Sequence, residues 1–318
     1  MANANALIQT APTLEQEVYK ALGGLLPSEL FAQYDLGQAE AFFHLGCGTG
    51  YWLCELAHSY PHLYGIGLAH HEPEQVQAAN RRAQQEGCDR LAFLSQDLRD
   101  LAPVSFPELR YDLIHLSFLS RYALTLDYAL LARVCVALCK PGSMICWTEA
   151  ELPITTSPAF ERWTALLCQG LQQVGQRFTV EPRHLPRSAD ATPFADQRRE
   201  LGITPLLGRW LRDAGCGWHP DAFQTWSRWH RHPRVVRQQG VVLDLSAGTF
   251  LHAAFVHEAL VGAEQIQPFL LRTGAISSAE YATLLKQMAA ELQRKDFYGS
   301  ALVLRVWGRV EPQDEGSN

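Results

Sequence analysis

The sequence predicts an α/β protein whose mostly parallel sheet is covered by helices on both faces. Two observations lead to this prediction. From Ala39 onward, short apolar runs alternate with longer amphipathic segments, and the first of these runs ends in a glycine-rich turn. Repeated strand and helix units of this length require right-handed crossovers between parallel strands. The chain has 318 residues, of which 47% are hydrophobic and 19% charged, so it can bury a large core.

The individual elements follow from the hydrophobic pattern in chain order. The first 38 residues show helical periodicity without a strand. The predicted strands are Ala41–Leu45, Leu63–Leu68, Leu91–Ser95, Tyr111–Ser117 and Ser143–Thr148, and the predicted helices between them are Tyr51–Ser59, Glu72–Glu86 and Asp127–Cys139.

After Glu151 the alternation of strands and helices is lost. Ser157 and Pro158 form the N-cap and first turn of a helix, and Ser277 with Glu280 forms a capping box for another. The other predicted elements of this part are a long polar loop over Arg177–Arg199, a helix over Leu206–Ala214, a helical stretch over Phe250–Leu260 and a strand over Ser300–Trp307.

Composition excludes several classes of protein. A net charge of -6 supplies no overall field that would attract nucleic acid. No run approaches the roughly 18 apolar residues of a membrane span, and the N-terminus lacks a basic segment followed by an apolar one, so we expect a cytoplasmic protein. Cys135 and Cys139 lack the companions of a zinc site. We therefore predict reduced cysteines and no metal.

The most informative segment is an apolar strand that runs into Gly46-Cys47-Gly48-Thr49-Gly50 and then a helix. Glycines at such a turn let the backbone approach a ligand, and the helix N-terminus favours negative charge. Tyr51 stands where the dinucleotide fingerprint requires a small residue, and the Gly-Lys-Ser/Thr of a P-loop is absent. The segment predicts a nucleotide-like ligand other than NAD.

With its neighbours, this segment resembles class I S-adenosylmethionine-dependent methyltransferases over Ala39–Glu149. The matching segments are His44–Gly50, Tyr64–Leu68, Ser95–Leu98, Tyr111–Ile114 and Lys140–Ser143, in the order of that family. The resemblance implies a Rossmann-like, seven-stranded, mostly parallel sheet, with an N-terminal helical segment and a helical cap or insertion. It also implies S-adenosylmethionine as cofactor and a small-molecule substrate.

The resemblance divides the chain into five parts. We expect a helical segment over residues 1–38, the cofactor-binding core over 39–150, and a mostly helical substrate cap over 151–298 that returns to the sheet near 203–226. The last strand of the core would follow at 299–310 and a tail at 311–318.

The same resemblance implies which residues hold the cofactor. They are His44, Gly46, Cys47, Gly48, Gly50, Gly67, Leu68, Glu72, Gln75, Asp97, Leu98 and Ser117. His44 and Gly67 stand where the family usually has acidic residues. Glu72 is then the candidate ribose acceptor, with Gln75 as its substitute, and Asp97 the acceptor for the adenine amine. Plainer roles remain open: a cap for Asp97, a first-turn glutamate for Glu72, and packing beneath the loop for His44.

Methyl transfer is an in-line displacement, so a general base is needed only when the acceptor must lose a proton. Glu149 and His115 are the candidates, although a core position is the alternative for His115. The tryptophans of the second half, together with Phe255 and His257, favour an apolar or aromatic metabolite, and a homodimer is compatible with that aromatic surface. Gly208–Gly215 and Leu302–Gly308 resemble segments of natural-product methyltransferases, which implies a role in secondary metabolism. The tryptophans concerned are Trp163, Trp210, Trp218, Trp226 and Trp229.

Two other functions stay open on the sequence alone. One is a cyclase or isomerase that binds the sulfonium without transferring its methyl group. The other is a non-catalytic binding protein, which the residues at His44 and Gly67 would favour.

Overall fold

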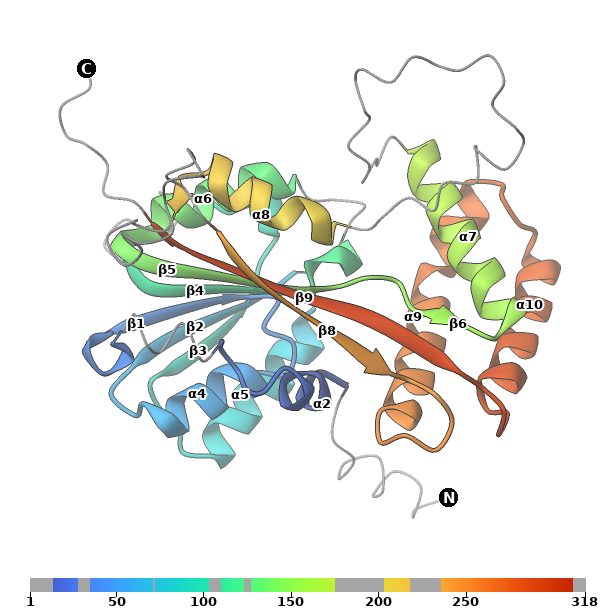
Figure 1. Ribbon diagram of the computed structural model, residues 1–318, viewed down its shortest axis with the longest axis horizontal. Helices are drawn as coiled ribbons and strands as arrows, with labels where there is room; N and C mark the ends of the chain where they lie inside the picture. The colour runs from blue at the N-terminus through green and yellow to red at the C-terminus, as the bar shows by residue number, and fades with distance from the viewer. Residues whose placement is uncertain are drawn as a thin grey trace, which may run out of the picture. The chain divides into compact units, whose positions relative to one another are not determined.

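The structure is a computed structural model, and it describes residues 14–27, 35–70, 72–102, 110–122, 127–174, 203–217 and 236–310 (Figure 1). The predicted loop over 177–199 and tail over 311–318 lie outside these residues. The chain divides into two compact units. Unit 1 contains residues 1–150, 206–241 and 303–318, and unit 2 contains residues 151–205 and 242–302.

The sheet of unit 1 has the order of a doubly wound fold. The strand order is β3-β2-β1-β4-β5-β9, in which β1 to β5 run parallel and β9 runs antiparallel to β5. Their bounds are β1 (Ala41–Leu45), β2 (Tyr64–Ala69), β3 (Leu91–Ser95), β4 (Tyr111–Ser117), β5 (Cys139–Ala150) and β9 (Gly299–Val310). The chain leaves β1 toward β2 on one side and reaches β4 on the other, so the carboxyl end of β1 is the switch point where ligands of such sheets bind.

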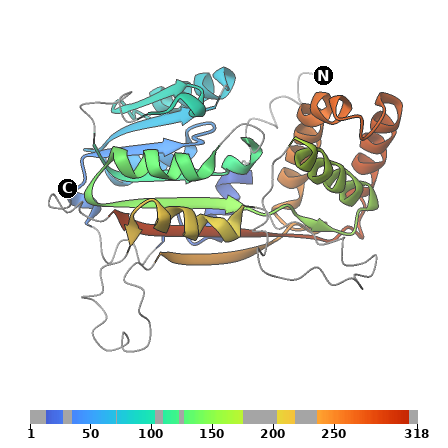
Figure 2. The ribbon, with the colours of Figure 1, turned by 90° about the horizontal axis from the view of Figure 1, so that it is seen from above.

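Helices cover both faces of this sheet (Figures 1 and 2). On one face the Trp52 indole of α4 packs against His44 and His115, and on the other Trp210 of α8 stacks on Tyr128 of α6. The helices of this unit are α2 (Leu14–Ala21), α4 (Tyr51–Ser59), α5 (Pro73–Gln85), α6 (Tyr128–Leu138) and α8 (Thr204–Asp213), with 3-10 turns η1 (Leu36–Gln38), η2 (Leu98–Asp100) and η4 (Leu119–Tyr122). The predicted α/β class with helices on both faces is thus confirmed.

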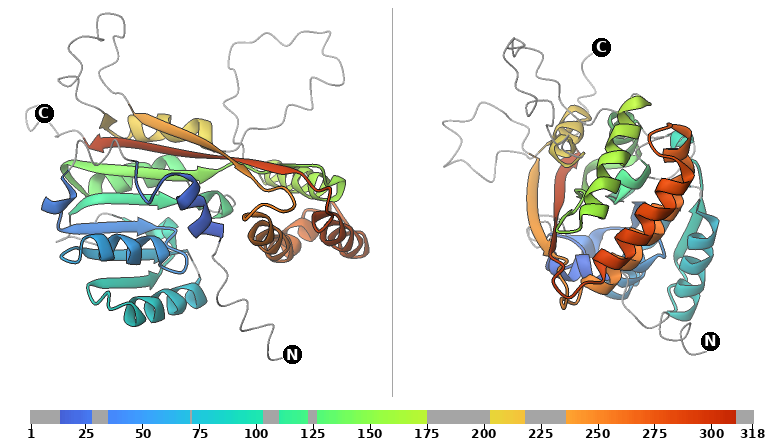
Figure 3. Two further views of the ribbon diagram at one scale, coloured as in Figure 1. Left: turned by 60° about the horizontal axis from the view of Figure 1, so that its bottom comes forward. Right: turned by 90° about the vertical axis from the view of Figure 1, so that its right-hand side faces the viewer.

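Unit 2 packs three helices together, as Figure 3 shows in its right-hand view. They are α7 (Pro158–Gln173), α9 (His252–Arg272) and α10 (Ser278–Leu292). The Trp163 indole donates to the Tyr281 hydroxyl at 3.0 Å, and that hydroxyl donates to the Ala263 carbonyl at 2.6 Å. The predicted capping box of α10 is present, because Ser277 and Glu280 exchange side-chain to backbone hydrogen bonds. No helix in the described part of the chain has the length and apolarity to cross a bilayer.

Three further strands join β9, so the described sheet has nine strands rather than seven. They are β6 (Ile154–Thr155), β7 (Cys216–Gly217) and β8 (Arg237–Asp244). Two of them have only two residues, which leaves no pattern to detect. β8 carries Arg237, Gln238 and Gln239 and is exposed at alternate residues, so its sequence lacks the apolar run of a buried strand.

Candidate functional site

The glycine turn after β1 adopts backbone angles that only glycine takes without strain. Gly46, Gly48 and Gly50 have φ values of 79°, 51° and 79°. A Cβ atom at Gly46 would lie 2.2 Å from the Ser117 carbonyl oxygen, and one at Gly50 would lie 2.9 Å from the Ala79 Cβ. The turn is therefore a tightly packed cradle, and we call residues 46–50 the glycine loop.

Helix α4 begins directly at the glycine loop. Its N-cap is Gly50, which offers no side-chain cap to the first turn of the helix. The partial positive charge of the helix N-terminus is therefore not balanced by its own cap residue, which suits a bound carboxylate or phosphate.

Two side chains lie over the middle of the glycine loop. A Cβ atom at Gly48 would lie 3.3 Å from Glu15 Oε2 of α2 and 3.6 Å from Gln75 Oε1 of α5. Gln75 Nε2 in turn donates to Glu72 Oε1 at 3.0 Å. The structure thus brings the two predicted ribose candidates to the loop and adds Glu15, which the sequence analysis missed because α2 precedes the recognisable core.

His44 lies beneath the glycine loop, inside the sheet. It is completely buried, its Nε2 lies 2.7 Å from Ser117 Oγ, and its ring stacks on His115. Ser117 Oγ also donates to the Gly46 carbonyl at 3.1 Å. His44 and Ser117, both predicted as cofactor ligands, here support the loop from below.

Gly67 and Leu68 of β2 also brace the loop. The Leu68 carbonyl accepts from the Gly46 and Cys47 amides at 2.9 and 3.1 Å. A Cβ at Gly67 would lie 2.5 Å from the Phe93 ring and 2.9 Å from the Cys47 Cβ. Gly67 is therefore a close-packing glycine, and an acidic residue would not fit there without displacing Phe93.

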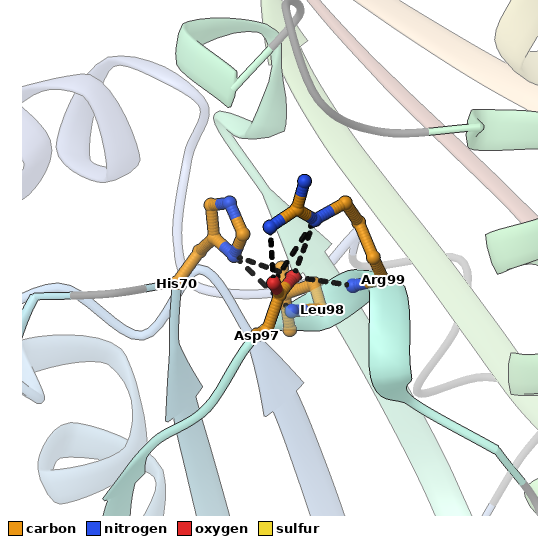
Figure 4. A network of polar contacts seen from close by, with 4 residues as sticks. All are labelled: His70, Asp97, Leu98 and Arg99. Carbon is orange, nitrogen blue, oxygen red and sulfur yellow. Dashed lines mark hydrogen bonds and ion pairs between the residues drawn. The ribbon is translucent and has the colours of Figure 1, made fainter.

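The predicted adenine contacts are engaged within the protein itself (Figure 4). Both Asp97 carboxylate oxygens accept from Arg99 Nε at 2.9 Å, and Oδ1 also accepts from the Arg99 amide, which caps η2. The Leu98 amide donates to His70 Nδ1 at 3.1 Å, and the same nitrogen lies 3.6 Å from Asp97 Oδ1. An adenine ring bound at this loop would replace Arg99 as the partner of Asp97, and His70 as the partner of the Leu98 amide.

Comparison with known proteins agrees with this geometry. Residues 42–142, which contain the glycine loop and strands β1 to β4, match the family model of a methyltransferase domain. No curated protein matches the chain.

The solved structures that resemble this chain have low sequence identity to it. The YcgJ protein of Bacillus subtilis is 12% identical, with a TM-score of 0.47, over 92% of this chain and 99% of that one. Geranyl diphosphate C-methyltransferase of Streptomyces coelicolor is 13% identical, with a TM-score of 0.43, over 93% and 80%. Phosphoethanolamine N-methyltransferase 2 of Haemonchus contortus is 14% identical, with a TM-score of 0.43, over 89% and 51%.

Of the two predicted catalytic residues, Glu149 lies at the carboxyl end of β5 and is completely buried. Its Oε1 accepts from the Ser120 hydroxyl at 2.7 Å and its Oε2 from the Ser120 amide at 3.1 Å. Burial raises the pKa of Glu149 to about 7, although the hydrogen bonds from Ser120 oppose this shift. Glu149 can therefore exchange a proton near neutral pH.

His115, the second candidate, occupies the middle of β4. Its Nε2 lies 3.1 Å from Thr148 Oγ1, and its ring centroid lies 4.4 Å from that of Trp52. Burial, with His44 and Arg305 as further causes, lowers the pKa of His115 well below its ordinary value. A neutral, enclosed imidazole favours the core position that was the alternative on the sequence.

The residues expected to line a substrate pocket have different surroundings. Trp163 and Phe255 are buried in the core of unit 2, and Trp210 packs on Trp147 in unit 1, whereas His257 is exposed. Trp218, Trp226 and Trp229 lie outside the described residues. Every tryptophan of the predicted set that the structure describes thus packs within its own unit.

Proposed function

We propose that this protein transfers the methyl group of S-adenosylmethionine to a small-molecule acceptor. The observation that carries the proposal is the glycine loop at the switch point of the sheet. There, three glycines form a cradle that a side chain would fill, Glu15 and Gln75 stand beside it, and Gln75 in turn donates to Glu72.

The residues present fit the parts of this cofactor. The glycine loop and the N-terminus of α4 would hold its carboxylate, and Glu15 would accept from its ammonium group, the role for which His44 is unsuited. Glu72, supported by Gln75, would accept from the ribose hydroxyls, and Asp97 from the adenine amine. When bound, the cofactor supplies a sulfonium-activated methyl group.

We assign proton removal from the acceptor to Glu149. With its pKa at about 7, the carboxylate is populated at neutral pH and still basic enough to take up a proton. Ser120 fixes the orientation of both carboxylate oxygens. An acceptor that carries no dissociable proton would react without Glu149.

We propose that the acceptor is a small molecule. Analysis of the product will show whether the methyl group is attached to oxygen, nitrogen or carbon. The expectation of an apolar or aromatic metabolite depended on the tryptophans of the second half. Because Trp163 is buried and the half-buried Trp210 packs on Tyr128 and Trp147, this part of the proposal now depends on Trp218, Trp226 and Trp229.

The first test is calorimetric titration of the full chain with S-adenosylmethionine and its demethylated product. We expect one site per chain for both. Incubation with methyl-labelled cofactor and fractionated metabolite extracts should then yield a labelled small molecule. Absence of binding for both compounds would refute the proposal.

A matched pair of glycine variants controls for folding. Gly48→Ala and Gly87→Ala both place a side chain at positive φ, so both carry a similar backbone cost of about 1–2 kcal/mol. A Cβ at Gly87 meets open space, whereas one at Gly48 enters the loop beside Glu15. Only Gly48→Ala should weaken cofactor binding, and equal weakening by both variants would count against the site.

A further inference from the structure

Four side chains with metal-binding atoms converge where helices α4 and α5 end, away from the glycine loop. Cys54 and His58 are four residues apart on α4 and therefore lie on the same face of the helix. Glu86 is the C-cap of α5, and Cys88 follows two residues later. Two segments far apart in the sequence thus supply two ligand types each.

Three of the donor atoms form a group, and His58 adjoins two of those three. The ligand atoms of Cys54, Glu86 and Cys88 all lie within 4.8 Å of one another. His58 Nε2 lies 3.6 Å from Cys88 Sγ and 3.7 Å from Glu86 Oε2. Around a tetrahedral zinc ion, with bonds of about 2.3 Å to sulfur and about 2.1 Å to nitrogen or oxygen, such donor pairs are about 3.4–3.6 Å apart.

Burial distinguishes an inner and an outer half of this cluster. Cys54 is completely buried and Cys88 is 7% exposed, whereas the side chains of His58 and Glu86 are 47% and 31% exposed. A metal ion can therefore reach the thiols past His58 and Glu86 from solvent.

The present contacts of the cluster are weak enough to be exchanged. Cys88 Sγ lies 4.0 Å from the Cys54 carbonyl and 3.9 Å from the Glu86 carbonyl, at the outer limit of hydrogen bonding by sulfur. Glu86 turns its other oxygen, Oε1, toward Arg82 Nη1 at 3.7 Å. Arg82 would partly balance the negative charge of two thiolates and a carboxylate around a divalent ion.

We propose that Cys54, His58, Glu86 and Cys88 form a structural site for Zn²⁺. Two thiolates with an imidazole and a carboxylate select Zn²⁺ over Mg²⁺ or Ca²⁺ because of the soft sulfur ligands. Binding replaces the two thiol protons, which pass to solvent. Four protein ligands complete the coordination shell of the ion. The ion therefore links α4 to the segment between α5 and β3 and takes no part in catalysis.

The test measures metal content, which does not depend on methyl transfer. The full chain is stripped with a chelator, dialysed and titrated with Zn²⁺ against a competing chelating dye, and with Co²⁺ as a spectroscopic probe. We expect one equivalent of metal, tetrahedral cobalt bands with a thiolate charge-transfer band, and a higher melting temperature with Zn²⁺ than with chelator.

Variants identify the ligands. His58→Ala alters a half-exposed side chain and should leave the fold intact, and Cys88→Ser removes one thiolate. Each should weaken Zn²⁺ binding by at least the roughly 10–100-fold that loss of an outer-shell partner costs. Cys168→Ser and His62→Ala are the controls, because Cys168 belongs to α7 and His62 Nε2 donates to the Ala39 carbonyl rather than contacting the cluster.

Two results would overturn the proposal. One is a parent protein that retains no Zn²⁺ and shows no tetrahedral cobalt spectrum. The other is binding of equal affinity by the parent, His58→Ala and Cys88→Ser proteins, which would place the metal elsewhere.

Discussion

Ser117 joins His44 to the glycine loop: its hydroxyl lies 2.7 Å from His44 Nε2 and donates to the Gly46 carbonyl at 3.1 Å. This buried bridge explains how the loop keeps its shape with a histidine beneath it. The histidine is a support below the loop, and the carboxylate above it comes from Glu15 on another element.

Ser117→Ala should therefore weaken both the fold and the site. Removal of the hydroxyl leaves two buried groups, His44 Nε2 and the Gly46 carbonyl, without this partner, at a cost of about 1–3 kcal/mol. Urea unfolding measures the loss of stability, and calorimetry measures the accompanying loss of cofactor affinity. Ser59→Ala, on the exposed side of α4, is the control and should change neither value.

Glu15→Gln tests whether the carboxylate of α2 serves the cofactor. If Glu15 accepts from the ammonium group, loss of its charge should weaken binding of S-adenosylmethionine about tenfold, the equivalent of about 1.4 kcal/mol. Calorimetry at low and moderate salt measures this change. Glu55→Gln on α4 is the matched control, and an equal effect of both substitutions would indicate a general effect of charge.

Arg99→Ala should strengthen cofactor binding. Arg99 holds the Asp97 carboxylate that the adenine amine would need, and its side chain is 54% exposed. An exposed ion pair is weak, so its absence should lower the dissociation constant by no more than about fivefold. Arg294→Ala, which breaks a similar exposed pair with Asp296 in unit 2, should have no effect. Weaker binding by Arg99→Ala would show that the pair orders the loop for the ligand.

The raised pKa of Glu149 predicts that the free energy of unfolding depends on pH. Its folded pKa of about 7 exceeds the ordinary value of 4.5, so the folded state binds its proton more tightly than the unfolded state. This contribution is fully present below about pH 4.5 and is lost as the pH rises through 7, to a total of about 3 kcal/mol at most. Chemical unfolding between pH 4 and 8 should show this decline in the parent and a smaller one in Glu149→Gln. Identical slopes would contradict the raised pKa.

The sequence predicted the core well because its signals are local. The strands β1 to β4 and helices α4 and α5 come from hydrophobic periodicity, and the loop at Gly46, Gly48 and Gly50 comes from glycine spacing. Each such signal lies within one short segment, so neighbouring residues suffice to detect it.

The other features of the candidate sites depend on contacts between segments that are distant in the sequence. Glu15 reaches Gly48 from a helix before the core, and the ligands Cys54 and Cys88 belong to different elements, so no spacing rule shows either pair. Cys135 and Cys139 are four apart on one segment and form a pair that the sequence shows directly, whereas Cys54 and Cys88 come together only in the folded chain. The hydrogen bond from Arg99 to Asp97 likewise depends on side-chain conformation, which the motif does not reveal.

Arg305 provides a final prediction, because it is a fully buried cation on β9. Its Nη2 donates to the Gly24 carbonyl at 2.7 Å and its guanidinium lies 5.9 Å from the Tyr19 ring centroid, and no carboxylate is among the groups that shift its pKa, which burial lowers. Removing the charge therefore orphans no buried anion in the described part of the chain. Arg305→Lys keeps the buried charge but loses the Nη2 hydrogen bond to the Gly24 carbonyl, and should cost about 1–3 kcal/mol. Arg305→Met removes the desolvation penalty and should be the more stable of the two in urea unfolding. The opposite order would mean that the positive charge itself stabilises this part of the fold.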